Sequence, residues 1–216
     1  MGPFSARPAG AATIQIVGLS RELVPDVTSI HLDAFPDYMS SLLGPRYVNA
    51  LMEWFRFGDR RVALVAIDAH RTPVGYVIGA PSGYSRSLTR DLLWVAGRSL
   101  LLRPWAALRG EFRDTALDRL RFMLLGSSSH SVSPALPPPT MALVGIAVSR
   151  EARGRDVGRL LLQSFEAAAL KLGMKSLLLS VYSDNVPARR LYERYRWKLH
   201  SSHGRSLLYS KIPEAQ

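Results

Sequence analysis

Residues 141–172 read MALVGIAVSREARGRDVGRLLLQSFEAAALKL, and the prediction of the fold starts here. The first eight residues, MALVGIAV, are apolar and partly β-branched, which is typical of a buried strand. The next ten, SREARGRDVG, are polar and contain glycine, which indicates a turn. From Arg159 to Leu172 the apolar residues recur at helical spacing. The stretch therefore predicts a strand, a loop and a helix in succession.

The loop between this strand and this helix is rich in arginine. The arginines that surround the start of the helix are Arg150, Arg153, Arg155 and Arg159. Gly154 and Gly158 offer positions at which the backbone can approach a ligand closely. The N–H groups of a first helical turn have no intrahelical partner, and the macrodipole places positive charge there. The sequence therefore predicts a site for a phosphate-bearing ligand such as a diphosphate.

Residues 148–158, VSREARGRDVG, resemble the acyl-CoA loop of the GNAT superfamily of N-acetyltransferases, which is written Arg/Gln-x-x-Gly-x-Gly/Ala after a strand that ends in Val. Arg153 and Gly158 match the first and last positions, but Asp156 stands where the family has its middle glycine. Either the backbone keeps ordinary helical dihedrals at Asp156, which Asp tolerates in a first turn, or this loop does not bind CoA in the usual way. We favour the first explanation, because a second motif agrees with the family.

That second motif lies at residues 185–197, NVPARRLYERYRW, which resemble the family's Asn-x-x-Ala-x-x-x-Tyr-x-x-x-Gly-Phe segment. Arg196 replaces the glycine before the final aromatic residue. The pair of motifs is far more specific than either alone. The resemblance implies a mixed α/β fold, with a twisted, mostly antiparallel sheet of about six to seven strands flanked by helices. It also implies transfer of an acetyl group from acetyl-CoA to an amine without a covalent enzyme intermediate.

The composition of the 216 residues limits the possible functions. A chain of this length, with 47% hydrophobic residues, can bury the core of one domain. The net charge of +11 attracts acidic or phosphorylated partners. Cysteine is absent, which excludes disulfides, thiolate metal sites and a cysteine acyl-enzyme. The arginines are spread through the chain without interleaved aromatic residues, so we expect no specific nucleic-acid partner.

The rest of the chain is expected to form one domain over residues 12–213, after a disordered tail over residues 1–11. The expected strands are 13–19, 62–67, 74–80, 141–148, 176–181 and 205–212, and the expected helices in this domain are 20–36, 46–57, 159–172 and 186–195. Between the third and fourth strands, residues 82–138 form an insertion with helical patterns at 88–102, 105–108 and 115–125. No internal repeat is visible.

Three roles remain open for the insertion. It can cover the acceptor site and set specificity, it can form a homodimer interface, or its arginines and its Trp94 and Trp105 can lie against an anionic membrane. We favour them in that order. The N-terminus lacks the apolar core of a signal peptide, and no uncharged run is long enough to span a bilayer. We therefore expect a cytoplasmic protein, with peripheral membrane contact as an alternative.

The resemblance also assigns the residues that bind acetyl-CoA. Backbone groups of Ile146, Ala147 and Val148 would pair with the pantetheine arm, and the N–H of Ile146 or Val148 could polarise the thioester carbonyl. The residues expected to bind the diphosphate are Arg153, Gly154, Arg155, Asp156, Val157, Gly158 and Arg159. Asn185 would contact the pantetheine or cap the following helix.

By the resemblance, Tyr192 is the catalytic residue that gives a proton to the departing CoA thiolate. The alternative is a core aromatic residue at helical spacing with Ala188 and Tyr195. On the motif position we favour the catalytic role. No metal site is expected, because His200 and His203 lack the spacing of zinc ligands.

The general base is not identified by the sequence. Many family members place a Glu on the fourth strand, where this chain has Ala142. The candidates near a substrate cleft are His31, Asp33, Asp37, Tyr38, His130 and Tyr182, and a water chain could replace them all. The acceptor is expected to be a small-molecule amine or an amino-sugar. The alternatives are a protein or peptide acceptor, or a non-catalytic sensor of acyl-CoA.

Overall fold

The computed structural model describes residues 14–102 and 136–213. In these residues seven strands form one sheet in the order β1-β2-β3-β4-β5-β7-β6. The strands are β1 (Gln15–Gly18), β2 (Val62–Ile67), β3 (Pro73–Pro81), β4 (Thr140–Val148), β5 (Ser176–Tyr182), β6 (Lys198–His203) and β7 (Ser206–Lys211). Neighbouring strands are antiparallel except β4 and β5, which are parallel. The predicted mixed, mostly antiparallel sheet is confirmed.

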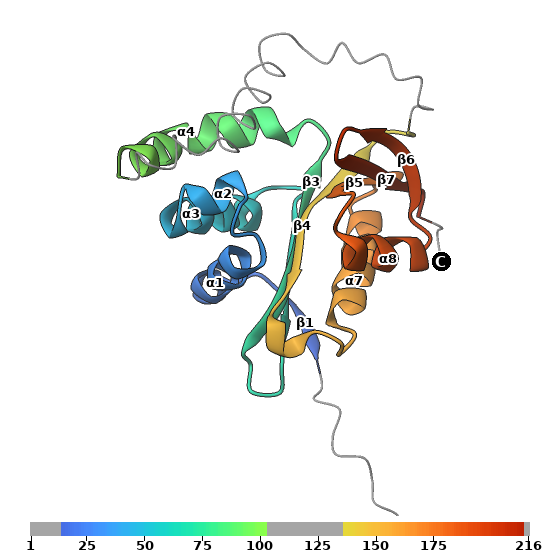
Figure 1. The fold of residues 1–216 in the computed structure, drawn as a ribbon, viewed down its shortest axis with the longest axis horizontal. Coiled ribbons are helices and arrows are strands. Elements are labelled where there is room, and N and C mark those ends of the chain that lie inside the picture. Colours follow the sequence, from blue (N-terminus) through green and yellow to red (C-terminus); the bar gives the residue numbers. More distant parts are fainter. Residues whose placement is uncertain (1–13, 103–135, 214–216) are drawn as a thin grey trace, which may run out of the picture.

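Helices cover both faces of this sheet (Figure 1). The α-helices are α1 (Val24–Ala34), α2 (Met39–Leu42), α3 (Pro45–Phe57), α4 (Tyr84–Leu102), α7 (Val157–Lys171) and α8 (Val186–Arg194), and the short 3-10 helices are η1 (Arg21–Leu23) and η2 (Arg150–Ala152). One core lies between the sheet and α1, α3 and α4, and includes Phe55 and Tyr76. The other lies between the sheet and α7 and α8, and includes Phe165 and Tyr192.

Helix α7 packs closely on β3 because two positions of β3 have no side chain. A Cβ atom on Gly79 would lie 2.4 Å from the Phe165 ring of α7, which is closer than real Cβ atoms approach other atoms. A Cβ atom on Gly75 would lie 3.0 Å from the Leu161 side chain of α7, which is tighter than most real contacts. These two glycines therefore set the distance between α7 and the strands that carry the site.

The elements differ from the prediction in a few places, and some predicted segments are not described by the structure. Helix α2 and strand β6 were not predicted, and α4 begins at Tyr84 rather than Leu88. The predicted helical insertion after the third strand is confirmed by α4. The predictions for residues 1–11, 105–108, 115–125 and His130 lie outside the described residues. Among the helices of the described residues, none has an apolar stretch of the length needed to cross a bilayer.

Candidate active site

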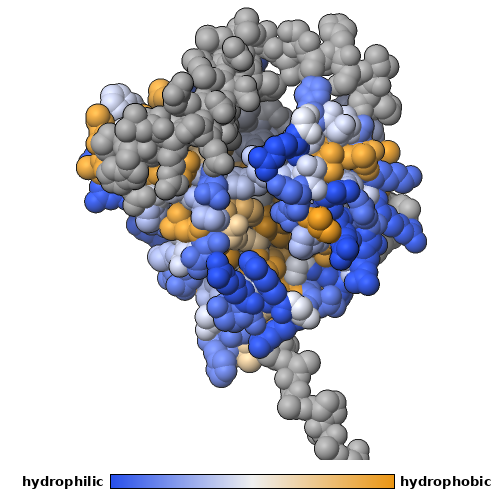
Figure 2. Space-filling view, viewed as in Figure 1, coloured by the Kyte–Doolittle hydropathy of each residue, from blue (hydrophilic) through white to orange (hydrophobic). Residues whose placement is uncertain are grey.

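The two parallel strands at the centre of the sheet separate part of the way along their length. β4 pairs with β5 from Thr140 to Leu143, and there the pairing ends. β4 continues to Val148 along β3, while β5 continues to Tyr182 along β7. An opening therefore lies between residues 144–148 of β4 and residues 180–182 of β5. In Figure 2, hydrophobic residues are visible along the middle of the molecule, with hydrophilic residues on either side. This is where β4 lies in the same view in Figure 1.

A β-bulge stands where the opening begins. The register pairs Gly79 with Leu143 and Ile78 with Gly145, so Val144 is the extra residue of β4. Such a residue reverses the alternation of side chains along a strand. Met141 and Leu143 belong to the core beneath α7, and after the bulge it is the even-numbered Ile146 and Val148 that pack against that same core.

The register also decides which backbone groups face the opening. The Ser149 N–H donates to the Val74 carbonyl oxygen at 2.9 Å, which makes Ser149 and Val74 a hydrogen-bonded pair. Antiparallel pairs alternate between hydrogen-bonded and non-hydrogen-bonded. The backbone of Ala147, which is opposite Tyr76, therefore points toward β3. The N–H and C=O groups of Ile146 and Val148 point the other way, into the opening.

The arginine-rich loop after β4 takes a turn that differs from the expectation at Asp156. After η2 the chain passes through Gly154, with φ +77°, and Asp156, with φ +66° and ψ 6°. The expected helical dihedrals at Asp156 are therefore wrong, because the residue is left-handed. Asp tolerates this region better than most residues with a side chain. The backbone thus takes a glycine-like conformation without the glycine.

The first turn of α7 has no side-chain cap. The Asp156 carboxylate accepts a hydrogen bond from Arg159 Nε at 2.8 Å instead of from a backbone N–H. The intrahelical ladder begins where the Leu160 N–H donates to the Asp156 carbonyl oxygen. The N–H groups of Val157, Gly158 and Arg159 precede that bond, and helix geometry gives them no intrahelical partner. This helix end can therefore accept an anion.

The arginines of the loop add to that positive end. Within residues 14–102 and 136–213, Arg150, Arg153 and Arg155 form no salt bridge, whereas Arg159 pairs with Asp156. Arg153 Nε lies 3.5 Å from the Val148 carbonyl oxygen, at the limit of a hydrogen bond. The loop thus places positively charged side chains next to the unpaired end of β4.

Gly158 marks the point at which three predicted elements meet. A Cβ atom there would lie 3.5 Å from Leu191 of α8 and 3.9 Å from Val148 of β4. Both are ordinary van der Waals distances. The first turn of α7, the end of β4 and helix α8 are therefore in contact at this point.

Tyr192 of α8 is buried, with 4% of its surface exposed. Its ring lies 6.1 Å from that of Trp197 and 6.2 Å from that of Tyr209. Burial, and to a lesser extent Tyr38, raises the pKa of the phenol, so the group stays protonated at neutral pH. The alternative to the catalytic role, a core aromatic position, is therefore what the structure shows for Tyr192. It does not exclude proton donation, because a general acid must carry its proton.

The second motif has the geometry of a capped helix that ends in a left-handed residue. Asn185 Oδ1 accepts a hydrogen bond from the Ala188 N–H at 3.3 Å, so the capping role of Asn185 is confirmed. Arg196 has φ +63° at the position where the family has glycine. Both residues that replace the family's glycines, Asp156 and Arg196, therefore have a left-handed backbone, which glycine adopts readily.

Aromatic residues from two distant segments meet beside the opening, at the end of β5. Tyr38, which precedes α2, lies with its ring 5.8 Å from that of Tyr182, the last residue of β5. Phe35 lies 4.9 Å from Tyr38. Burial, then Tyr182 and Asp184, raises the pKa of Tyr38. The sequence named both tyrosines as base candidates but gave no sign that they touch.

The other candidate bases differ in their surroundings. His31 is buried, and its ring nitrogens hydrogen-bond the Tyr76 hydroxyl at 2.6 Å and the Ser40 hydroxyl at 2.8 Å. Burial lowers the pKa of His31 to about 4, so the ring is a poor proton acceptor. Asp33 and Asp37 are exposed. Tyr76 was missed by sequence reasoning, because nothing in an apolar strand pattern signals a buried hydroxyl that bonds a histidine 45 residues away.

Comparison with known proteins shows the family of this chain. The model of the acetyltransferase (GNAT) family matches residues 24–196, and the chain belongs to that family. No curated protein sequence matched the chain.

Three solved structures illustrate the shared fold. A GCN5-related N-acetyltransferase from Kribbella flavida has 16% identity and a TM-score of 0.57, over 93% of this chain and 98% of that one. The ribosomal-protein-S18-alanine N-acetyltransferase from Escherichia coli has 14% identity and a TM-score of 0.56, over 94% and 97%. The PaiA N-acetyltransferase from Thermoplasma acidophilum, solved in complex with coenzyme A, has 12% identity and a TM-score of 0.53, over 93% and 99%.

Proposed function

We propose that this protein transfers an acetyl group from acetyl-CoA directly to the amine of a small molecule or an amino-sugar. The observation that carries the proposal is the opening between β4 and β5, which begins at the Val144 bulge and exposes the backbone of Ile146 and Val148. It ends beside the uncapped first turn of α7. A ligand with an extended amide arm and a diphosphate matches both features.

In the proposed complex the diphosphate lies at the start of α7. The loop residues Arg153, Gly154, Arg155, Asp156, Val157, Gly158 and Arg159 surround it, through backbone N–H groups and guanidinium groups. The pantetheine arm adds to β4 in the manner of an extra strand, bonded to Ile146 and Val148. Ala147 keeps its backbone bonds to β3 and holds this edge in place. Asn185 lies at the start of α8, where it can also contact the arm.

The reaction is a direct displacement at the thioester carbonyl. The deprotonated amine forms the new C–N bond, and the C–S bond to CoA breaks. A backbone N–H of Ile146 or Val148 stabilises the oxyanion, a contribution of about 10²–10³ in rate for such a donor. Tyr192 gives its proton to the departing thiolate and regains one, through water, from the nitrogen of the newly formed amide. The proton of the acceptor ammonium leaves through water, since the chain has Ala142 in place of a strand carboxylate.

The acceptor class is inferred from an aromatic contact at the end of β5. The contact between Tyr38 and Tyr182 joins the α1–α2 segment to the end of β5. This bridge favours a small acceptor over a peptide that would have to pass through in an extended form. The Escherichia coli neighbour named above is described as a protein N-acetyltransferase, so a peptide acceptor is the alternative to be tested.

The proposal is tested by thiol release from acetyl-CoA against a panel of amines, amino-sugars and peptides. Tyr192→Phe should lower kcat by about 10²–10⁴ with one acceptor class, because it removes a general acid. Tyr195→Phe, on the same helical turn, is the matched control and should keep most of the activity. CoA binding without turnover on any acceptor would favour a non-catalytic sensor. Failure to bind CoA would refute the proposal.

A further inference from the structure

The outward face of α4 exposes large apolar side chains. Trp94 is 84% exposed, and Leu101, about two helical turns further on and on the same side, is 82% exposed. Leu93 and Leu102, at the two edges of this face, are more than half exposed. The opposite side of the helix, with Leu88, Leu92 and Ser99, is buried against the domain. A helix that exposes aromatic and aliphatic residues together on one side has an apolar surface that invites a partner.

Arginines share this exposed face. At 100° per residue, Arg86, Arg90 and Arg98 fall on the same half of the helix as Trp94 and Leu101. α3 and α4 together carry five arginines and two carboxylates. Both carboxylates are already paired, Glu53 with Arg56 at 2.7 Å and Asp91 with Arg90 at 3.1 Å. The charge left over on this face is therefore positive.

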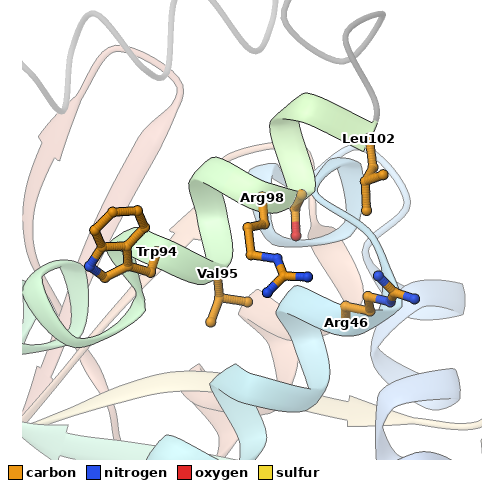
Figure 3. Close-up of a pocket in the computed structure, with 6 residues that line it drawn as sticks. Arg46, Trp94, Val95, Arg98 and Leu102 are labelled. Carbon is orange, nitrogen blue, oxygen red and sulfur yellow. The ribbon is translucent and has the colours of Figure 1, made fainter.

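A cavity of about 350 Å³ between α3 and α4 brings two of these cations together. Figure 3 shows the side chains of Arg46 and Arg98 pointing into the space between the two helices, with Leu102 above Arg46 and Trp94 toward the other end. In the part of the chain that the structure describes, neither arginine has a salt bridge to a carboxylate. Two unpaired guanidinium groups beside apolar side chains form a place for a phosphate whose ester is attached to a hydrocarbon.

We propose that this face, made of Arg46 and of Arg86, Trp94, Arg98, Leu101 and Leu102, docks on an anionic phospholipid bilayer. The apolar side chains enter the interface and the arginines lie at the level of the phosphates, as in interfacial helices that combine a basic charge with aromatic residues. A second copy of the chain would bring the same positive face against this one, and the repulsion disfavours that occupant. The proposal does not depend on the acetyl-transfer reaction.

The test is co-sedimentation of the full chain with vesicles of phosphatidylcholine alone, or with one quarter phosphatidylglycerol. Binding should require the anionic lipid. It should also weaken steeply between 0.1 and 1 M salt, where the Debye length falls from about 10 to 3 Å. Blue-shifted tryptophan emission with anionic vesicles, lost in Trp94→Phe, would place Trp94 in the interface.

Matched variants separate this face from generic attraction to a basic protein. Arg98→Glu should weaken binding by at least about fivefold, the effect of one cation near an anionic surface. Arg194→Glu, at the end of α8, makes the same change in net charge and should have little effect. Leu101→Ser should weaken binding by roughly tenfold, whereas Leu199→Ser on the exposed strand β6 should not.

Equal effects of Arg98→Glu and Arg194→Glu would overturn the proposal, because they would show attraction by net charge alone. Equal binding to both kinds of vesicle would overturn it too, as would an unchanged affinity in Leu101→Ser. Self-association that Leu101→Ser abolishes, without vesicle binding, would assign the face to a second copy instead. Circular dichroism of each variant checks the fold.

Discussion

The two halves of β4 have similar apolar sequences but different partners. From Thr140 to Leu143 the strand is bonded on both edges, to β3 and to β5. From the bulge at Val144 to Val148 it is bonded to β3 alone, and its other edge is open. An open strand edge inside a sheet leaves backbone donors and acceptors unpaired. The first half therefore holds the fold together, and the second half is available for a ligand.

Because both halves of β4 are apolar, hydrophobicity alone does not distinguish a strand segment that binds a ligand from one that is part of the core. The bulge at Val144 decides the outcome, because one extra residue ends the pairing to β5 and turns Ile146 and Val148 toward the core beneath α7. After the bulge, the amides of Ile146 and Val148 face the opening, whereas that of Ala147 faces β3. The comparison between the halves, and between neighbouring residues in the open half, can therefore be tested by single substitutions.

The largest expected effect comes from proline at two adjacent positions of the open half. Ala147→Pro removes an N–H that faces β3 and should destabilise the protein by about 3 kcal/mol or more. Val148→Pro removes an N–H that faces the opening, so the fold should tolerate it while CoA affinity or kcat falls by roughly 10²-fold. Thermal unfolding and CoA titration measure the two effects. If both variants lose stability equally, the assigned register is wrong.

The stability of the protein should depend on pH through a buried histidine behind the open half of β4. Tyr76, opposite Ala147, is held by His31, whose pKa is lowered to about 4 by burial. Between pH 6.5 and 4 the unfolded chain binds a proton at this histidine that the folded chain does not. Stability should therefore fall as the pH falls through this range, by about 3 kcal/mol from His31.

Denaturation of wild type and His31→Gln across pH 4–7 measures this contribution. The free energy of unfolding should change less steeply with pH in His31→Gln. His70→Gln, at an exposed turn, should keep the pH dependence of the wild type. NMR titration of the His31 ring checks the pKa directly. A value near 6.5 would contradict the buried, neutral state.

The smallest expected effect concerns the turn that follows the open half. Because Asp156 is left-handed, Asp156→Gly should be neutral or raise stability by up to about 1 kcal/mol, and Asp156→Ala should lower it by about as much. Urea denaturation ranks the two variants. A helical backbone at Asp156 would reverse the ranking, because alanine is the better helix former by about 1 kcal/mol.

Much of the fold could be predicted from the sequence, because strands such as Val62–Ile67 are apolar runs between turn residues. Strand β6 could not, since its residues KLHSSH form an exposed edge without an apolar pattern. For the site, the two motifs located the loop and Tyr192. The bulge at Val144 leaves the apolar run of residues 141–148 uninterrupted. The sequence therefore could not predict which way the amides of Ala147 and Val148 point.

Two further features of the site depend on tertiary contacts. The left-handed backbone at Asp156 and Arg196 cannot be read from residues that also occur in helices. The contact between Tyr38 and Tyr182 joins segments that are far apart in the chain.

The most direct test of the account is amide hydrogen exchange along β4, followed residue by residue by NMR with and without acetyl-CoA. The amides of Ile146 and Val148 should exchange quickly in the free protein and become protected when acetyl-CoA is added. The amides of Met141 and Leu143, in the paired half, should be protected in both states. Protection of Ile146 and Val148 before the ligand is added, or no change on its addition, would contradict the claim that this half of β4 receives the pantetheine arm.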